Sequence, residues 1–200
     1  GRVKFRWVRP LHRVNLMFDG KPIIGALNLG SGEQIEFGAT SCGHYFEAPD
    51  DIDLSDTTSL DDVKTRLRDA FVIIDPAERQ NAILDGARAL ASAKSCKVNE
   101  AQLESDLGDI AGLVEWPTPL MGQIDSRFMA LPPELLQSTI ATHQKYITLS
   151  EADGSFSKYF ILISNRLPDT VRDKVIVAGN QRVLRARLTD AEFFWRQDQT

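Results

Sequence analysis

Two short apolar runs decide the fold class: Tyr159-Phe160-Ile161-Leu162-Ile163-Ser164 and, before it, Tyr146-Ile147-Thr148-Leu149. Aromatic and β-branched residues dominate both runs, and Asp153-Gly154 between them is a strong turn signal. The stretch therefore predicts a β-hairpin. A single hairpin is marginal in water, so its apolar residues need further elements to pack against.

Strands and helices are expected on both sides of this hairpin. The expected strands are residues 5–8, 14–18, 23–27, 34–37, 71–74, 114–116 and 120–124, with Asp19-Gly20 as a hairpin turn and Pro117 and Pro119 as interruptions. Capping signals predict helices that begin at Ser59, Asp75, Asn99 and Pro132, and a last helix over Asn180–Trp195. The mixture lacks regular βαβ alternation, which favours an α+β fold. Because no long linker is visible, we expect a single compact domain over residues 1–200.

Composition excludes several classes of protein. With 42% apolar residues and a net charge of −5, the chain is neither globally disordered nor a uniformly basic nucleic-acid clamp. No window approaches ~18 consecutive apolar residues, so we expect no membrane span. The basic residues within 1–13 lack the apolar segment of a signal peptide. Cys42 and Cys96 have no C-x-x-C spacing, which favours a reduced, cytoplasmic location.

Charge is distributed unevenly along the chain. Residues 1–45 carry six basic and three acidic side chains, residues 46–110 carry seven and fifteen, and residues 111–200 carry ten of each. A net negative field repels phosphate, so any contact with RNA must use local cationic patches. We expect the acidic middle to be a solvated helical face or to meet another protein.

Sequence motifs for nucleotide binding and hydrolysis are missing. There is no G-x-x-x-x-G-K-[ST], H-E-x-x-H or G-x-S-x-G, and Gly30-Ser31-Gly32 lacks the third glycine of a dinucleotide loop. His12, His44 and His143 lie far apart without ligand spacing. We therefore expect no catalytic residue and no metal site; zinc or nucleophile chemistry at Cys42 and His44 is the weaker alternative.

Cations on the expected last helix are candidates for RNA contact. At ~100° per residue, Leu184 and Leu188 share one side of the helix, whereas Arg182 and Arg185 fall on the opposite side. Two guanidinium groups one turn apart suit neighbouring phosphates. Arg187 lies at the edge of the apolar stripe, placed to pair with a carboxylate. A solvated helix face without a partner explains the same pattern and stays open.

Two further segments combine cations with aromatic rings. His143-Gln144-Lys145-Tyr146 joins a helix end to a strand and offers a stacking ring beside polar donors. His and Lys also suit a helix C-terminus for electrostatic reasons alone. Arg9 belongs to an N-terminal strand expected to place cations on one face, either for RNA contact or to protect a sheet edge.

Six blocks together resemble the β subunit of bacterial-type glycyl-tRNA synthetase. They are WVRPLH at 7–12, GHYFEAP at 43–49, VEWP at 114–117, LPPE at 131–134, HQKY at 143–146 and GNQRVLRARLTDAEFF at 179–194. The blocks appear in the family's order and span essentially the whole chain. Where the family usually has Arg-Gly-His-Arg-Phe, this chain has Cys42-Gly43-His44-Tyr45-Phe46, so two cations are missing from that loop.

The resemblance implies a module of a cytoplasmic α/β heterotetramer, with two copies of each subunit, that joins glycine to tRNA-Gly. It implies that the α subunit holds the catalytic site, with ATP and Mg²⁺, and that this part of the longer β subunit needs no cofactor. The implied fold is a mixed α+β fold, with mainly antiparallel sheets packed with several helices, similar to the editing-type module of phenylalanyl-tRNA synthetase. The candidate RNA-binding residues are Arg9, His12, His44, His143, Lys145, Tyr146, Arg182 and Arg185.

Three functions stay open at this point. We favour a non-catalytic module that supports tRNA binding and α/β assembly and is inactive by itself. A hydrolytic editing module is the first alternative, for which His44 and His143 are the histidines near polar loops. Glycine is the smallest amino acid, so steric exclusion weakens the need for editing. The second alternative is a subunit-interaction scaffold whose interface is the acidic middle.

Overall fold

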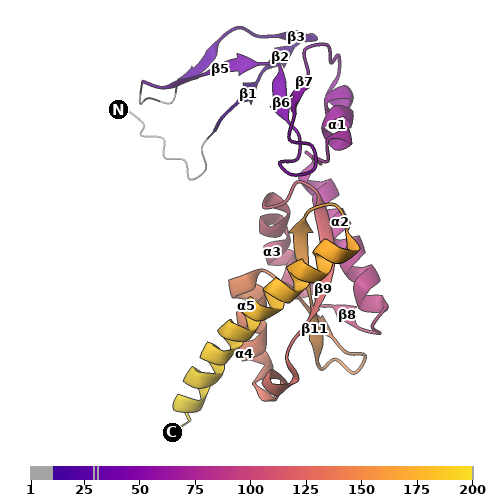
Figure 1. Cartoon of the computed structure of the whole chain (residues 1–200), viewed down its shortest axis with the longest axis vertical. Helices are drawn as coiled ribbons and strands as arrows, with labels where there is room; N and C mark the ends of the chain where they lie inside the picture. The colour runs from indigo at the N-terminus through magenta and orange to yellow at the C-terminus, as the bar shows by residue number, and fades with distance from the viewer. Residues whose placement is uncertain (1–10, 29, 31, 200) are drawn as a thin grey trace. The chain divides into compact units, whose positions relative to one another are not determined.

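The computed structural model describes residues 11–28, 30 and 32–199, and its contacts divide the chain into two compact units, Gly1–Ile74 and Asp75–Thr200 (Figure 1). We expected one compact domain because no linker interrupts the sequence. The boundary falls directly before Asp75, which is the N-cap of a helix, so the division carries no Gly- or Ser-rich signal. The predicted strand at 5–8 lies outside the described residues.

The first unit contains short strands and one helix. Its strands are β1 (Val14–Asn15), β2 (Met17–Phe18), β3 (Lys21–Pro22), β4 (Ala26–Asn28), β5 (Gln34–Gly38), β6 (Thr40–Cys42) and β7 (Asp51–Asp53). The turn at Asp19-Gly20 is confirmed, with both residues at positive φ between β2 and β3. The predicted hairpin is shortened, because β1 and β4 both pair with β5, β1 in parallel and β4 antiparallel.

Helix α1 (Leu60–Asp69) begins as predicted, since Ser59 and Asp62 form a reciprocal capping box. The strand predicted at 71–74 is wrong. Val72 donates its N–H to the Leu67 carbonyl, and Phe71 adopts a φ of 60°, which is the left-handed residue of a helix C-terminal motif. The apolar run therefore ends a helix instead of pairing with a strand.

A four-stranded antiparallel sheet organises the second unit. Its order is β8 (Lys97–Val98), β10 (Ile147–Ser150), β11 (Phe156–Asn165) and β9 (Pro117–Gln123). The β10–β11 pair confirms the predicted hairpin, with Gly154 in its turn. The strand predicted at 120–124 is confirmed as part of β9, whereas the strand predicted at 114–116 is wrong, and both prolines lie within β9 instead of interrupting it. An edge strand tolerates proline where the missing N–H faces away from its neighbour.

Helices cover both faces of this sheet. They are α2 (Pro76–Ser92), α3 (Glu100–Gly112), α4 (Pro133–Gln137), which continues as a π-helical turn over Ser138–Thr142, and α5 (Thr170–Gln197), with a 3₁₀ turn at Ser126–Ala130. The helix starts predicted at Ser59, Asp75, Asn99 and Pro132 are confirmed, whereas α5 begins at Thr170, before the predicted Asn180. Within the described part of the chain, no helix combines the length and the apolar character that crossing a bilayer requires. The α+β prediction is confirmed.

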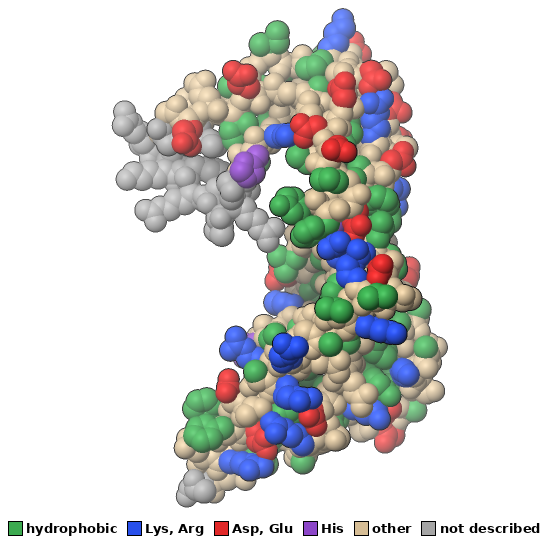
Figure 2. Space-filling view, in the orientation of Figure 1, with side chains coloured by type: hydrophobic (Ala, Val, Ile, Leu, Met, Phe, Trp, Pro, Cys, Tyr) green, Lys and Arg blue, Asp and Glu red, His purple; other side chains and the backbone are tan. Residues whose placement is uncertain are grey.

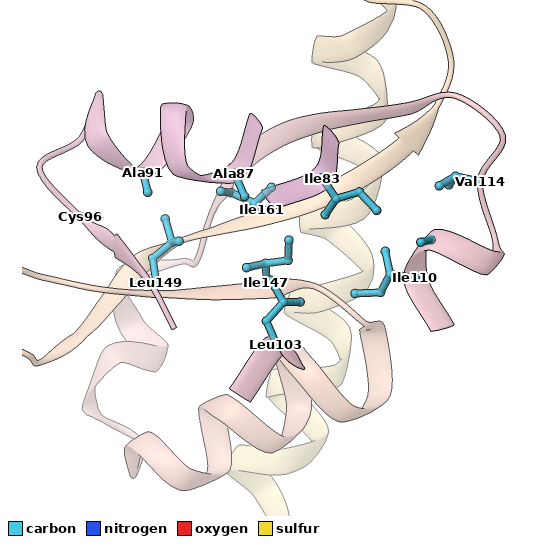
Figure 3. Close-up of a cluster of buried hydrophobic side chains, with 11 residues drawn as sticks. Ile83, Ala87, Ala91, Cys96, Leu103, Ile110, Val114, Ile147, Leu149 and Ile161 are labelled. Atoms are coloured by element: carbon cyan, nitrogen blue, oxygen red, sulfur yellow. The ribbon is translucent and has the colours of Figure 1, made fainter. Parts of the chain in front are cut away.

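Alternate residues of β11 enter two separate cores. Ile161 packs with Ile83 of α2 and Leu103 of α3 on one face of the sheet (Figure 3). Phe160 and Leu162 pack on the other face with apolar residues of α5 and of the short helices. The apolar stripe of α5 therefore points at the sheet, and the rest of its surface faces solvent.

The packing of Phe160 against Gly122 of β9 can be tested by substitution. A Cβ atom there would lie 2.3 Å from the Phe160 ring, so Gly122→Ala overpacks the core and should lower the free energy of unfolding by about 1–3 kcal/mol. Gly179→Ala is the matched control, because nothing lies within 4 Å of its added methyl group on α5. It should stabilise the protein by about 0.5–1 kcal/mol. Urea denaturation monitored by circular dichroism measures the free energy of unfolding of both variants. Equal changes in the two variants would contradict the packing of Phe160 against Gly122.

Candidate nucleic-acid interface

Helix α5 carries several exposed cations, among them Arg182, Arg185 and Arg187. Its start is fixed by Asp169, whose carboxylate accepts hydrogen bonds from the backbone N–H groups of Val171 and Arg172 and consequently has a lowered pKa. Leu184 and Leu188 are fully buried against the sheet. The helix bears six Lys or Arg and three Asp or Glu residues. Figure 2 shows Lys and Arg side chains in a row along this helix.

Arg182 and Arg185 lie on the solvent side of α5, as the helical periodicity predicts. The Arg185 side chain is 63% exposed, and its Nη2 lies 3.4 Å from Asp125 Oδ2. An exposed ion pair of this length holds the guanidinium weakly, because water screens it. Arg127 lies near the same helix and donates from Nη2 to Thr189 Oγ1 at 2.7 Å. Both predicted arginines are therefore accessible to a ligand.

A groove of about 790 Å³ lies between the α4 segment and the C-terminal half of α5. His143 and Gln144 line one side, and Arg187 and Trp195 line the other. The remaining lining residues are Pro132, Glu134, Leu135, Ser138, Thr139, Ala191, Phe194 and Asp198. The groove thus combines a cation, aromatic rings and hydrogen-bonding side chains. The sequence indicated His143 and Arg187 as separate candidates. They line one groove only because α5 packs beside the α4 segment.

Lys145 and Tyr146 turn away from this groove. Lys145 has a φ of 55°, and its Nζ binds the carboxylates of Asp106 and Asp109, which raises the pKa of the lysine. The Tyr146 hydroxyl donates to Asn180 Oδ1 at 2.6 Å, and burial raises the pKa of that phenol. Of the segment His143–Tyr146, which we expected to contact RNA as a unit, only His143 and Gln144 therefore line the groove.

His44 is fully buried in the first unit. Its Nδ1 accepts hydrogen bonds from the backbone N–H groups of Phe46 at 3.3 Å and Glu47 at 3.2 Å. The ring thus organises its own loop and is not presented to solvent. Cys42 is exposed and contacts Asp51, with 3.9 Å between Sγ and Oδ1. Among the described side chains, no three His, Cys, Asp or Glu residues assemble as metal ligands.

Of the two N-terminal candidates for RNA contact, His12 is described by the structure and Arg9 is not. His12 is exposed and lines a hollow of about 420 Å³ in the first unit, together with Arg13, Asn15 and Glu36. Arg9 lies outside the described residues. In the second unit, His143 and Arg187 both line the groove. Arg182 and Arg185 precede Arg187 on the same helix.

Comparison with known proteins shows one consistent match. A family model described as "Glycyl-tRNA synthetase beta subunit" matches residues 1–200. The chain is 41% identical to "Glycine--tRNA ligase beta subunit" of Rhodospirillum centenum over 99% of the chain and 30% of that protein. Identity is 41% to the Paracoccus denitrificans protein of the same name and 39% to that of Syntrophus aciditrophicus, over 99% and 100% of the chain. The chain spans less than a third of the length of these relatives.

Tyr146 provides a test of its structural role. Tyr146→Phe leaves Asn180 Oδ1 without its donor, and we expect the free energy of unfolding to fall by about 0.5–1.5 kcal/mol. The control is Tyr159→Phe, because the Tyr159 ring makes its contacts with Lys94 and Lys158. That control should change stability by less than about 0.5 kcal/mol. Chemical denaturation measures both, and an unchanged Tyr146→Phe variant would contradict the assignment.

Proposed function

Because the chain belongs to the glycyl-tRNA synthetase β-subunit family, we propose that it is a non-catalytic module of a glycine–tRNA ligase that supports tRNA-Gly binding. The observation that carries this proposal is the cationic outer side of α5, where Arg182 and Arg185 are exposed. Arginine binds phosphate oxygens in a bidentate manner, and a set of such contacts supplies salt-dependent affinity for RNA.

Two of the candidate titratable groups, Lys145 and His44, are engaged within the protein, which argues against their acting as catalysts. Lys145 is engaged by two carboxylates, and His44 accepts hydrogen bonds inside its loop. We place the ligase chemistry, with ATP and Mg²⁺, on the α subunit. The module alone should accordingly form no glycyl-adenylate and need no cofactor.

Assembly with a partner is the second part of the proposal. The name of the relatives implies a partner α subunit. We propose that the β chain joins it in a cytoplasmic heterotetramer with two copies of each subunit, and that this module contributes to the assembly. Glu104 and Asp109 of α3 are exposed and support such a role, because exposed carboxylates steer association with a basic surface.

The α5 arginines can be tested in the full-length ligase assembled with its partner subunit. Arg182→Ala combined with Arg185→Ala should weaken tRNA-Gly binding and reduce the slope of log K against log salt by about 1–2, because two phosphate contacts are lost. Fluorescence anisotropy with labelled tRNA at several salt concentrations measures both quantities.

Arg88→Ala is the matched control for this experiment. Its guanidinium is held by Glu100 at 2.8 Å and by Asp85, so its loss should leave tRNA affinity unchanged. The glycylation rate at saturating tRNA should also stay unchanged in the double variant, which separates binding from catalysis. An affinity and a salt slope equal to those of the unaltered ligase would overturn the proposal for α5.

Hydrolytic editing is the alternative that one observation favours: His143 lines the 790 Å³ groove with Glu134, Ser138 and Thr139. An activating imidazole beside hydroxyl groups in a concave site is compatible with ester hydrolysis. We expect no such activity, so the ligase should deacylate alanyl-tRNA-Gly at the same rate with and without His143→Ala. A rate that depends on His143 would replace the non-catalytic proposal with editing.

A further inference from the structure

The 3₁₀ turn over Ser126–Ala130 brings a third arginine, Arg127, to the outer side of α5. Asp125 begins this turn, and its Oδ1 accepts a hydrogen bond from the Arg127 backbone N–H at 3.3 Å. Arg127 is exposed, and its Nη2 donates to Thr189 Oγ1 of α5 at 2.7 Å. The helical periodicity of α5 could not indicate Arg127, because this residue lies 62 positions before Thr189 in the sequence.

Thr189 places Arg127 one helical turn from Arg185. The Thr189 hydroxyl accepts from Arg127 and donates to the Arg185 carbonyl at 2.8 Å. Side chains four positions apart on a helix are neighbours, with ~5–6 Å between their Cβ atoms. The Arg127 guanidinium also lies 4.3 Å from the centroid of the buried Phe128 ring. The guanidinium is thus held by a hydroxyl and a ring, and among the described residues no carboxylate pairs with it.

The nearest negative charge to this pair of arginines belongs to Asp125. Its Oδ2 lies 3.4 Å from Arg185 Nη2, and the two side chains are 31% and 63% exposed. This distance exceeds the ~2.7–2.9 Å of a strong charge-assisted hydrogen bond, and water screens such an exposed pair. One carboxylate therefore faces two guanidinium groups, Arg127 and Arg185, and a net positive charge remains for an anion.

A hollow of about 220 Å³ lies between the 3₁₀ turn and α5. Ser126, Gln181 and Arg185 contribute polar groups to its lining, and the buried Leu184 and Leu188 contribute apolar surface. The Gln181 side-chain amide donates to the carbonyl of the last residue of β9 at 2.8 Å, which ties α5 to the sheet beside the hollow. The hollow is therefore concave, bounded by fixed elements and supplied with hydrogen-bonding groups, which is typical of a binding site.

We propose that Arg127 and Arg185 together bind a phosphate group of the RNA backbone beside this hollow, and that the phosphate replaces Asp125 as the partner of Arg185. Guanidinium groups bind phosphate oxygens through paired hydrogen bonds, and here two of them come from different elements. Arg182 lies one turn before Arg185 on the exposed side of α5, so a neighbouring phosphate of the same strand has a cation as well. This inference rests on the proposed tRNA binding and adds Arg127 and Asp125 to it.

The test uses the full-length ligase assembled with its partner subunit, with tRNA-Gly affinity measured by fluorescence anisotropy at several salt concentrations. Arg127→Gln removes the charge but keeps a side-chain amide that can donate to Thr189. We expect it to raise the dissociation constant about three- to tenfold and to reduce the slope of log K against log salt by about 1. Arg88→Gln is the matched control, because it makes the same change of charge at an arginine that Glu100 already holds. It should leave both quantities unchanged.

Asp125→Asn is a second variant, for which the expected change has the opposite sign. Asparagine keeps an oxygen that can cap the 3₁₀ turn, but it removes the charge that competes with phosphate for Arg185. We expect tRNA-Gly to bind about two- to fivefold more tightly, since an exposed ion pair of this kind is worth little. A merely structural role of Asp125 would lower the affinity instead. Thermal unfolding of every variant verifies that it folds.

The inference fails if Arg127→Gln keeps the affinity and salt slope of the unaltered ligase, or if Asp125→Asn brings no gain. In that case a loss of affinity in Arg182→Ala combined with Arg185→Ala would still support tRNA binding by α5, so the two failures are distinguishable. Inorganic phosphate is the last probe, compared with chloride at equal ionic strength. Stronger displacement of tRNA by phosphate, abolished by Arg127→Gln, would instead assign the site to a free phosphate ion.

Discussion

The burial of β11 on both faces is the constraint on which the second unit depends. A strand covered on both sides places apolar side chains at consecutive positions, here residues 159–163, and alternate residues must fit different cores. Phe160 contacts the α5 side, where its ring lies against Gly122 and stacks on Tyr146 at 5.0 Å. Ile161 contacts α2 and α3. Because Leu184 and Leu188 complete the Phe160 core, the orientation of α5 follows from the same strand, and Arg182 and Arg185 must face outward.

The electrostatic character of the chain changes from unit to unit. Several charged side chains form ion pairs within the chain. Arg88 of α2 pairs with Glu100 of α3, and Lys145 pairs with Asp106 of α3. Helix α5 carries six Lys or Arg against three Asp or Glu residues, whereas residues 22–63 contain nine Asp or Glu and no Lys or Arg.

The site residues show where helical periodicity predicts exposure and where it does not. The outward positions of Arg182 and Arg185 follow from the angle per residue, since α5 is regular and has one apolar stripe. Lys145 and Tyr146 follow a π-helical turn, and the positive φ of Lys145 redirects both side chains. His44 resembled a surface loop residue because Gly43 and Tyr45 flank it. Only the approach of Ala70 and of its own loop amides shows that it is buried.

Local signals in the sequence determined the helix starts at Ser59, Asp75, Asn99 and Pro132, the turns at Asp19-Gly20 and Asp153-Gly154, and the apolar run of β11. These features depend on neighbours within a few residues, such as the capping box of Ser59 and Asp62. The tertiary structure alone decided that β1 pairs in parallel with β5, that β9 accommodates two prolines, and that the apolar run after α1 closes a helix. Strand pairing and burial are contacts between segments distant in sequence, and no short window of residues specifies which partner each segment meets.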